Sequence, residues 1–181
     1  MADIGGREIY ELAASLFPLC RSITGDGVRE TLGILGRYVE NSCGAKLNVH
    51  EIPSGTKVFD WTVPKEWEIR AAYIENEAGE RIVDMARHNL HVLGYSTPVD
   101  RWVELEELKR YLYTQPEQPD VIPYVTSYYQ ERYGFCMSEN QKNALESGMY
   151  HMYIDSELKQ GALNYGEIVI PGESGKEVFF S

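Results

Sequence analysis

The chain has 181 residues, of which 43% are apolar and 25% are charged, and its 17 basic and 28 acidic residues give a formal net charge of −11. This composition is typical of a globular protein, and the lack of any Lys/Arg cluster argues against a nucleic-acid partner. No stretch approaches the roughly 18 apolar residues of a membrane span, and three widely spaced cysteines favour reduced thiols in a cytoplasmic protein.

Two amphipathic helices are predicted at the start of the chain. Apolar residues from Ile9 to Phe17 recur at i, i+3, i+4, i+7 and i+8, which is typical of one helix face. A second helix should begin near Asp26 and end at Gly44, because glycine readily takes the left-handed conformation that ends helices. Its inward face would carry Val28, Leu32, Leu35 and Val39.

The next segments alternate between strand patterns and turns. Residues 46–52 alternate as a strand, and residues 71–84 predict a hairpin that bends at 77–80. Residues 90–105 predict a second strand pair that turns around 96–98, followed by one short helix over 104–113. In that helix Glu106 could meet Arg110 at i+4.

The last third of the chain combines a proline-rich loop, a helix and three strands. Residues 114–124 contain three prolines and should form an extended loop. Ser138 and Gln141 have the spacing of a capping box, and Gly148 would end the helix that they begin. Strands are predicted over 149–158, 163–170 and 176–181, the last after a Pro-Gly/Ser-Gly turn.

The order of these elements predicts an α/β fold interrupted by an inserted, β-rich α+β subdomain. An aromatic-rich middle section separates two pieces of an α/β pattern. We therefore assign residues 1–57 to a first part, residues 58–148 to the inserted subdomain and residues 149–181 to a return to the first sheet.

Most groups that could be catalytic have a structural interpretation. His88 and His91 lie three apart in a segment that looks extended, so their side chains should point to opposite faces, with no third ligand nearby for a metal. Cys136 lies among apolar residues and should be buried and inert.

One segment favours ligand binding, the stretch CRSITGDGVRETL at 20–32. Arg21, Ser22 and Thr24 lie between two helices, beside a Gly-Asp-Gly helix entrance. Free backbone N–H groups there would favour an anionic ligand group, and Arg21 could add a bidentate contact. Alternatively, Ser22 or Thr24 caps the helix together with Asp26, while Arg21 pairs with the acidic surface.

Several long motifs together resemble one known family. These are CRSITGDGVRETL, IPSGTKVFDWTVPKEW, NLHVLGYSTPVD, YTQPEQPDVIPYVTSYYQERYGFCMS and IDSELKQGALNYGEIVIPGESGKEVFFS. They resemble the N-terminal part of the bacterial aminopeptidase-like proteins that are described mostly as domains of unknown function, distant relatives of the di-zinc aminopeptidases. The resemblance covers nearly all of the chain.

This resemblance implies a zinc-aminopeptidase-like α/β fold with a mixed, mostly parallel central sheet, and hydrolysis of a small peptide or aminoacyl substrate. The family's metal ligands and general-base glutamate follow the strand that matches EVFFS, so none has a matching position here. We therefore expect an N-terminal fragment without catalytic or metal-binding residues of its own, in which Arg21, Ser22 and Thr24 contribute to substrate binding. The edge left at EVFFS would favour self-association.

A different class of function remains open, a non-catalytic module that binds a sugar or a peptide. The middle section could present stacking surfaces through Trp61, Trp67, Trp102, Tyr128, Tyr129 and Tyr133. The same aromatic residues could instead fill the core of a small β-rich domain. Two or three coplanar, exposed rings would favour binding.

Overall fold

The computed structural model describes residues 5–128 and 130–180. Within these residues no helix is long and apolar enough to cross a bilayer. In chain order the helices and strands are α1 (Gly6–Leu16), α2 (Asp26–Cys43), β1 (Leu47–Pro53), β2 (Lys57–Val58), β3 (Trp61–Thr62), β4 (Glu66–Asn76), β5 (Arg81–Asp84), η1 (Asn89–His91), β6 (Val99–Glu104), α3 (Leu105–Leu108), η2 (Lys109–Tyr111), β7 (Leu112–Tyr113), β8 (Phe135–Cys136), α4 (Glu139–Asn143), β9 (Met149–Lys159) and β10 (Ala162–Ile168).

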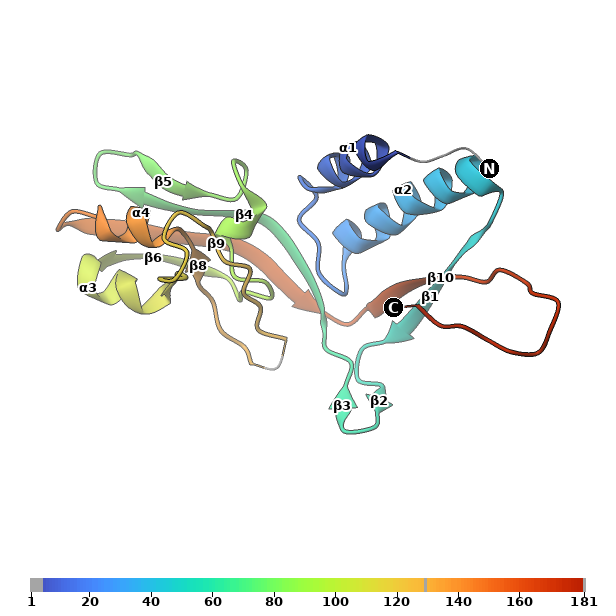
Figure 1. The fold of residues 1–181 in the computed structure, drawn as a ribbon. Helices are drawn as coiled ribbons and strands as arrows, with labels where there is room; N and C mark the ends of the chain where they lie inside the picture. The colour runs from blue at the N-terminus through green and yellow to red at the C-terminus, as the bar shows by residue number, and fades with distance from the viewer. Residues whose placement is uncertain (1–4, 129, 181) are drawn as a thin grey trace.

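The fold is mixed α/β and contains several small sheets. The largest has four antiparallel strands in the order β5-β4-β9-β6, and a separate antiparallel pair joins β1 to β10 (Figure 1). The two remaining pairs are β2-β3, which is antiparallel, and β7-β8, which is the one parallel pair within the described residues. Among those residues the structure therefore contains no mostly parallel central sheet.

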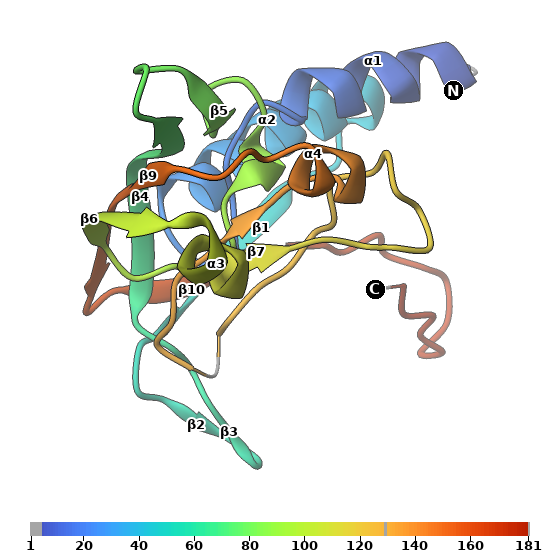
Figure 2. The same cartoon turned by 90° about the vertical axis from the view of Figure 1, so that its left-hand side faces the viewer.

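The hydrophobic core lies against one face of the four-stranded sheet. Along β9, Tyr150, Met152 and Ile154 are buried while the residues between them are partly exposed, which is the two-residue period of a strand with one covered face. Phe135 from β8 and Leu108 from α3 are fully buried against this face. Figure 2 shows the short helices and strands of the middle section gathered beside β9 and β6.

The N-terminal helices lie apart from this core. Helix α2 runs beside β1 and β10 (Figure 1), and a Cβ at Gly166 would lie 3.0 Å from Leu32, so glycine allows the close approach. Helix α1 buries only Leu16, and Ile9 and Tyr10 are exposed. The predicted apolar face of α1 is therefore mostly uncovered.

Several predicted elements are confirmed. Both N-terminal helices form, and Gly44 ends α2 with a φ of 72°. The first hairpin forms as β4-β5, with Gly79 at a φ of 78° in its bend. Ser138 and Gln141 form the predicted capping box of α4, and residues 114–124 contain no helix or strand.

The predicted strand pair around residues 96–98 is wrong. Only its second half is a strand, β6, and that strand pairs with β9. The first half instead makes isolated bridges from Val92 to Phe135, from Gly94 to Thr126 and from Ser96 to Arg132. Both halves hydrogen-bond to partners that are distant in sequence, so proximity in the chain did not decide their pairing.

Two local predictions about the short helices are also corrected. The carboxylate of Glu106 pairs with Lys109 at 2.6 Å, where Arg110 was expected. Helix α4 ends at Asn143 with Ala144 as its C-cap, so Gly148 does not end it. Gly148 instead accepts a hydrogen bond from the backbone N–H of Leu105, at 3.2 Å.

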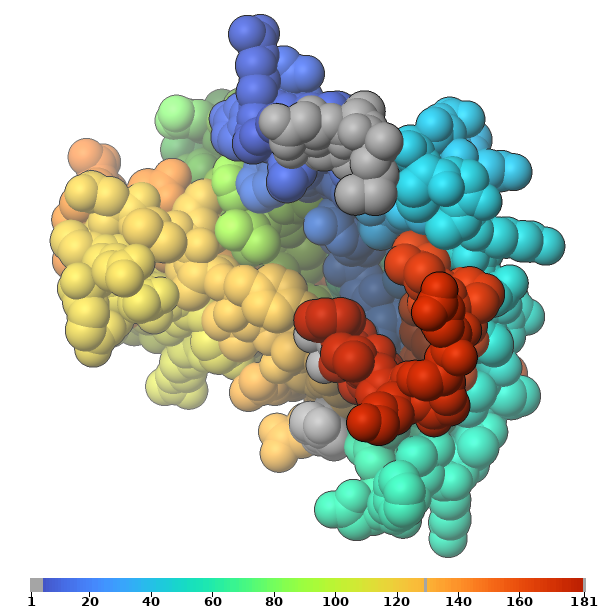
Figure 3. Space-filling model, turned by 45° about the vertical axis from the view of Figure 1, so that its right-hand side comes forward, coloured from blue at the N-terminus to red at the C-terminus, as the bar shows by residue number. Residues whose placement is uncertain are grey.

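The predicted strand over residues 176–181 does not form in its described part, residues 176–180. A strand needs a neighbour for its N–H and C=O groups, and no described residue pairs with this segment. Val178, Phe179 and Phe180 are 79%, 87% and 89% exposed. Figure 3 shows the C-terminal segment, in red, at the surface of the molecule.

Strand β9 joins the middle section to the last part of the chain. It pairs along its length with β4 and β6, so residues 149–159 belong to the sheet of the middle section. The chain returns to the N-terminal region only with β10, which pairs with β1. The division into 1–57, 58–148 and 149–181 stays a prediction about domains.

Candidate functional site

The link between α1 and α2 holds all three predicted binding residues, and glycine lets it approach β4 closely. Gly25 has a φ of 89°, and a Cβ there would lie 2.5 Å from the carbonyl oxygen of Trp67. A Cβ at Gly27 would lie 2.1 Å from the carbonyl oxygen of Cys20. A side chain at Gly25 would therefore force the link away from β4, and one at Gly27 would force the start of α2 away from Cys20.

Arg21 contacts the end of α1. Its Nη1 donates hydrogen bonds to the carbonyl oxygens of Leu16, at 2.6 Å, and Leu19, at 3.4 Å. Helix C-termini leave such carbonyls without partners, and a guanidinium group is well suited to satisfy them. Arg21 is otherwise exposed. The alternative interpretation expected Arg21 to pair with the acidic surface, but its hydrogen bonds go to main-chain carbonyls instead.

Thr24 anchors the link to the middle section. It is 2% exposed, and its Oγ1 lies 2.7 Å from the hydroxyl oxygen of Tyr95 and accepts a hydrogen bond of 3.1 Å from the backbone N–H of Trp67. Burial raises the pKa of Tyr95 to about 12. Gly25 is the N-cap residue of α2, and no side chain makes a capping hydrogen bond there, so the predicted capping by Ser22 or Thr24 does not occur.

The entrance of α2 is occupied by a carboxylate of the chain itself. The backbone N–H of Asp26 donates to Oε1 of Glu68 at 2.8 Å, which is the kind of anion that a helix N-terminus favours. The sequence predicted that an anionic ligand group would bind at this helix entrance. In the structure the carboxylate of Glu68 already accepts the hydrogen bond from the Asp26 N–H.

Arg29 connects this entrance to β4 through several carboxylates. Its Nη1 and Nη2 donate to the two carboxylate oxygens of Glu66 at 3.0 and 2.9 Å, and Nη2 also donates to Asp26 at 2.6 Å. These hydrogen bonds lower the pKa of Glu66 and raise that of Arg29. The sequence analysis missed this cluster, although Glu66 and Glu68 are two apart in a strand pattern and so could have been assigned to one face.

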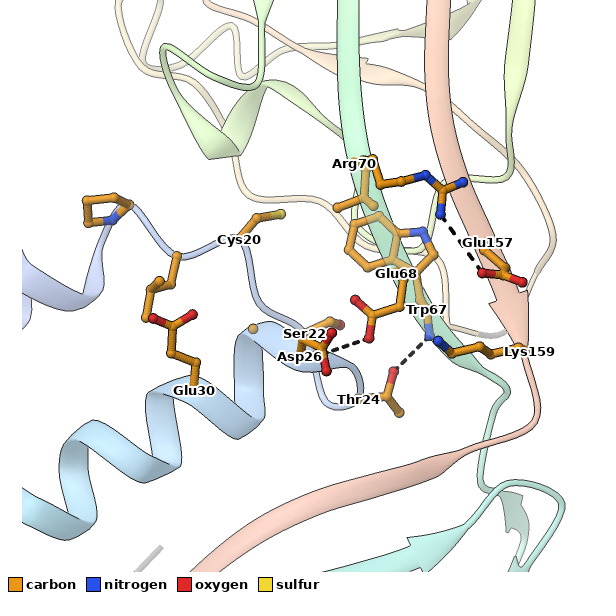
Figure 4. A pocket seen from close by; sticks show the side chains of 14 residues that line it. Cys20, Ser22, Thr24, Asp26, Glu30, Trp67, Glu68, Arg70, Glu157 and Lys159 are labelled. Atoms are coloured by element: carbon orange, nitrogen blue, oxygen red, sulfur yellow. Dashed lines mark hydrogen bonds and ion pairs between the residues drawn. The ribbon is translucent and has the colours of Figure 1, made fainter.

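A cavity of about 520 Å³ lies beside this cluster, between the link, α2 and the long strands β4 and β9. Figure 4 shows Ser22, Thr24 and Asp26 near Glu68, with Arg70 and Glu157 approaching from the other side. Its charged lining residues are Asp26, Glu30, Glu68, Arg70, Glu157 and Lys159. Carboxylates outnumber cations here, so the cavity is better suited to a cationic than to an anionic group.

A second cavity, of about 490 Å³, lies on the side of the link that faces residues 89–94 and 124–128. Ser22 lines both cavities, Thr24 lines only the first and Arg21 only the second. The three predicted residues are therefore close in the chain, but they do not converge on one site.

The histidines and Cys136 form no metal site with other described side chains. Within residues 5–128 and 130–180 there is no group of three or more His, Cys, Asp or Glu residues placed to hold a metal ion. His88 and His91 do not point to opposite faces, because a 3₁₀ turn brings their ring centroids to 5.7 Å. Cys136 is buried as predicted, and burial raises the pKa of its thiol to about 12.

The aromatic residues of the middle section are divided between core and surface. Trp67 is in the core, and Tyr133 stacks on Tyr111 with their ring centroids 4.7 Å apart. Trp102 is 48% exposed and stacks on His151 at 5.1 Å. Tyr129 lies outside the described residues. Trp67, Trp102 and Tyr133 therefore do not form one common platform.

Known proteins resemble this chain over most of its length. A protein of Clostridium acetobutylicum named "Putative polysaccharide biosynthesis protein with aminopeptidase-like domain" is 49% identical over 176 residues, which are 97% of this chain and 39% of that protein. A crystal structure described as a "putative peptidase" from Clostridium acetobutylicum has a TM-score of 0.81 at 50% identity, covering 89% of this chain and 37% of that one. The chain thus spans less than half the length of these relatives.

A family model matches the middle of the chain. Residues 66–157 match the family described as "Domain of unknown function (DUF2172)". This range takes in strands β4, β5 and β6 and most of β9, which form the four-stranded sheet and carry much of its core. The chain belongs to the DUF2172 family.

Proposed function

We propose that this chain is the N-terminal part of a zinc-dependent, aminopeptidase-like hydrolase that acts on a small peptide or aminoacyl substrate. The names of the relatives, an aminopeptidase-like domain and a peptidase, support a peptidase-like function. In this proposal the catalytic residues belong to the further length that the relatives possess, and the chain supplies one wall of the substrate cleft.

The observation that carries this proposal is the incomplete covering of the N-terminal region. The pair β1-β10 has helix α2 beside it, yet Val49 on β1 and Tyr165 on β10 are 49% and 46% exposed. On α1, Ile9 and Tyr10 are 59% and 73% exposed. Val49 and Tyr165 lie on opposite faces of the pair, so apolar side chains are exposed on more than one side of this region. Exposed apolar side chains of this kind are typical of surfaces that pack against further polypeptide, as a larger peptidase domain would require.

The zinc ion of this proposal has no site among the described residues. A catalytic zinc needs about three N or O ligands from the protein, and residues 5–128 and 130–180 offer no such group. The ion would have to be bound by residues outside these ranges. Arg21 and Ser22 would contribute to the cleft by binding substrate, while Thr24 would support its floor through Tyr95 and the Trp67 N–H.

The test is to read the gene on both sides of this chain and to assay the complete product. We expect histidine and acidic residues beyond Ser181, bound zinc by elemental analysis, and release of the first residue from aminoacyl-p-nitroanilides. A chelator should abolish the activity and zinc should restore it. A complete product that purifies without metal and leaves all such substrates intact would contradict the proposal.

The exposed tryptophan of β6 favours a second candidate, a sugar- or peptide-binding module. Trp102 stacks on His151, whose Nε2 lies 2.7 Å from a carboxylate oxygen of Asp100, so an aromatic face adjoins polar groups. Such a combination suits a saccharide ring or a peptide side chain. Binding of oligosaccharides that is lost in Trp102→Ala, in a complete product without peptidase activity, would favour this candidate.

A further proposal concerns association between copies of the chain. Two apolar stretches are exposed, Val169 and Ile170 at 63% and 79% and Phe179 and Phe180 at 87% and 89%, and contact with another copy would remove such surface from water. We expect concentration-dependent association in sedimentation experiments, reduced by the double change Phe179→Ser and Phe180→Ser. Unchanged association in that variant would exclude Phe179 and Phe180 as the cause.

A further inference from the structure

The second cavity combines apolar walls with a few polar groups. It lies between the α1-α2 link and the middle section, and its apolar walls include Phe17, Leu90, Val92 and Tyr124. With a volume of about 490 Å³ it falls in the range of small-molecule sites, which often lie where two regions of a protein meet. Size and apolarity alone do not identify a ligand, but the polar groups at its wall are more specific.

Two residues that line this cavity carry buried polar atoms without a partner in the described structure. They are Oγ of Ser22 and Oδ1 of Asn89. A buried polar atom without a hydrogen bond costs about 1–3 kcal/mol, and such atoms are rare in folded proteins. Both residues line one cavity although they are 67 positions apart in the chain, and a ligand that displaced the atoms covering Ser22 Oγ and Asn89 Oδ1 would supply the missing partners.

The orientation of the Asn89 amide is determined by its neighbours. Its Nδ2 donates to the carbonyl oxygen of Phe17 and, at 3.3 Å, to that of Leu19. A flipped amide would place Oδ1 against these two acceptors, so the nitrogen must face them. Oδ1 is therefore the atom left over, and because it only accepts hydrogen bonds, its partner must be a donor.

The charge of the cavity wall favours an anion. Among the described residues that line it, Arg21 is the one charged side chain. No carboxylate lines it, in contrast to the first cavity across the same link, which Asp26, Glu30 and Glu68 line. A free ammonium group would find no ion-pair partner in the second cavity, whereas an uncharged N–H could bind Asn89 Oδ1.

We infer that the second cavity binds the C-terminal residue of a short peptide, with its apolar side chain between Phe17, Leu90 and Tyr124. The carboxylate would lie near Arg21, and the amide N–H of the same residue would donate to Asn89 Oδ1, with Ser22 Oγ beside it. This inference deepens the proposed function, because it rests on Arg21 and Ser22 binding a peptide substrate, and it names which end of the peptide they bind.

Three small probes separate the groups of this ligand. N-acetyl-L-phenylalanine has the aromatic side chain, the acylated N–H and the carboxylate. N-acetyl-L-phenylalaninamide lacks the carboxylate, and 3-phenylpropionate lacks the N–H. Titrations of the 181-residue chain, followed by NMR shifts or calorimetry, should give a dissociation constant in the millimolar range for the first probe. Each of the other two should bind about three- to tenfold more weakly.

Two variants connect these losses to named residues. In Arg21→Gln the advantage of N-acetyl-L-phenylalanine over its amide should disappear. Ser22→Ala should weaken the complete probe about three- to tenfold, yet leave the melting temperature equal or higher, because it removes a buried hydroxyl without a partner. Ser42→Ala is the matched control, since its hydroxyl donates to Tyr38 within α2 and it does not line the cavity.

The outcomes separate this inference from the proposed hydrolysis. Binding of N-acetyl-L-phenylalanine that depends on Arg21 and Ser22 supports the inference even if the complete product has no peptidase activity. Absence of saturable binding by all three probes at about 10 mM, or equal binding by wild type and Ser22→Ala, overturns the inference. In that case zinc content and aminopeptidase activity of the complete product still decide the proposed function.

Discussion

The four-stranded sheet and the N-terminal region of this chain differ in how they are stabilised. The sheet has a core of fully buried side chains, such as Ile74, Met152 and Phe135. The N-terminal helices with β1 and β10 bury few residues, and the apolar Ile9 and Val49 remain exposed. The region that matches DUF2172 thus contains its own core, whereas the N-terminal region depends more on its contacts with that core.

The junction between the two regions combines specific polar contacts with the packing of Cys20 and Ile23 against the core. Arg29 on α2 binds Glu66 on β4, and Thr24 binds Tyr95 and the Trp67 N–H. Polar contacts of this kind give less stabilisation than apolar burial, but they require specific geometry. The following predictions test this difference, in order of decreasing effect.

The largest effect should come from removing a core side chain of the sheet region. Phe135→Ala should lower the free energy of unfolding by about 3–5 kcal/mol, because the side chain is 0% exposed. Chemical denaturation measures this change. The matched control, Phe17→Ala in the N-terminal region, removes a ring that is 48% exposed and should have a much smaller effect. Equal losses would contradict the difference between the regions.

Hydrogen exchange should distinguish the two regions in the unmodified protein. Amides of β9, where alternate residues are buried, should open with a free energy higher by about 2–4 kcal/mol than those of β1, where every residue is at least partly exposed. Mass spectrometry of peptides from the two strands measures the rates. Similar protection in β1 and β9 would mean that the chain unfolds as one cooperative unit.

A smaller loss is expected when the carboxylate at the junction is neutralised. Glu66 has a side chain that is 7% exposed and bound by Arg29, so Glu66→Gln should lower the free energy of unfolding at pH 7 by about 1.5–3 kcal/mol. Denaturation curves of the variant and the wild type at this pH measure the change.

The pH dependence of the same variant has a defined sign. The hydrogen bonds from Arg29 lower the pKa of Glu66 below its ordinary value of 4.5. A carboxylate whose pKa is lowered by folding stabilises the folded protein at pH values above its ordinary pKa. This stabilisation is lost as the pH falls through the lowered pKa of the folded state. The difference between wild type and Glu66→Gln should therefore shrink as the solution is acidified below pH 4.5. A difference that stays constant down to low pH would exclude this role.

The smallest effect should come from the Tyr95 hydroxyl. Tyr95→Phe should cost about 0.5–1.5 kcal/mol, because Thr24 keeps its hydrogen bond from Trp67. Burial raises the pKa of Tyr95 to about 12. Folding therefore favours the protonated, neutral hydroxyl of Tyr95. The resulting contribution to the free energy of unfolding is fully present below pH 10.0, the ordinary pKa of tyrosine, and is lost as the pH rises toward 12. Ultraviolet titration should show one fewer late-titrating tyrosine in the variant.

Local patterns in the sequence predicted much of the secondary structure. The spacing of Val28, Leu32, Leu35 and Val39 identified α2, and Gly44 marked its end. Ser138 and Gln141 predicted the start of α4. In these cases residues within one or two turns determine the backbone, so the physical cause is itself local. Of the candidate site, the sequence identified the link that carries Arg21, Ser22 and Thr24, but not what each residue contacts.

The tertiary structure decided what depends on distant partners. The segments 90–96 and 176–180 have strand-like sequences, but one pairs far along the chain and the other finds no partner among the described residues. Thr24 meets Tyr95 across 71 positions, and Ser22 shares a cavity with Asn89. The sequence by itself determined which short segments are helical or extended, because those preferences act within a few residues. Only folding decided strand partners, cavity walls and unpaired polar atoms, because each depends on groups that the chain brings together from far apart.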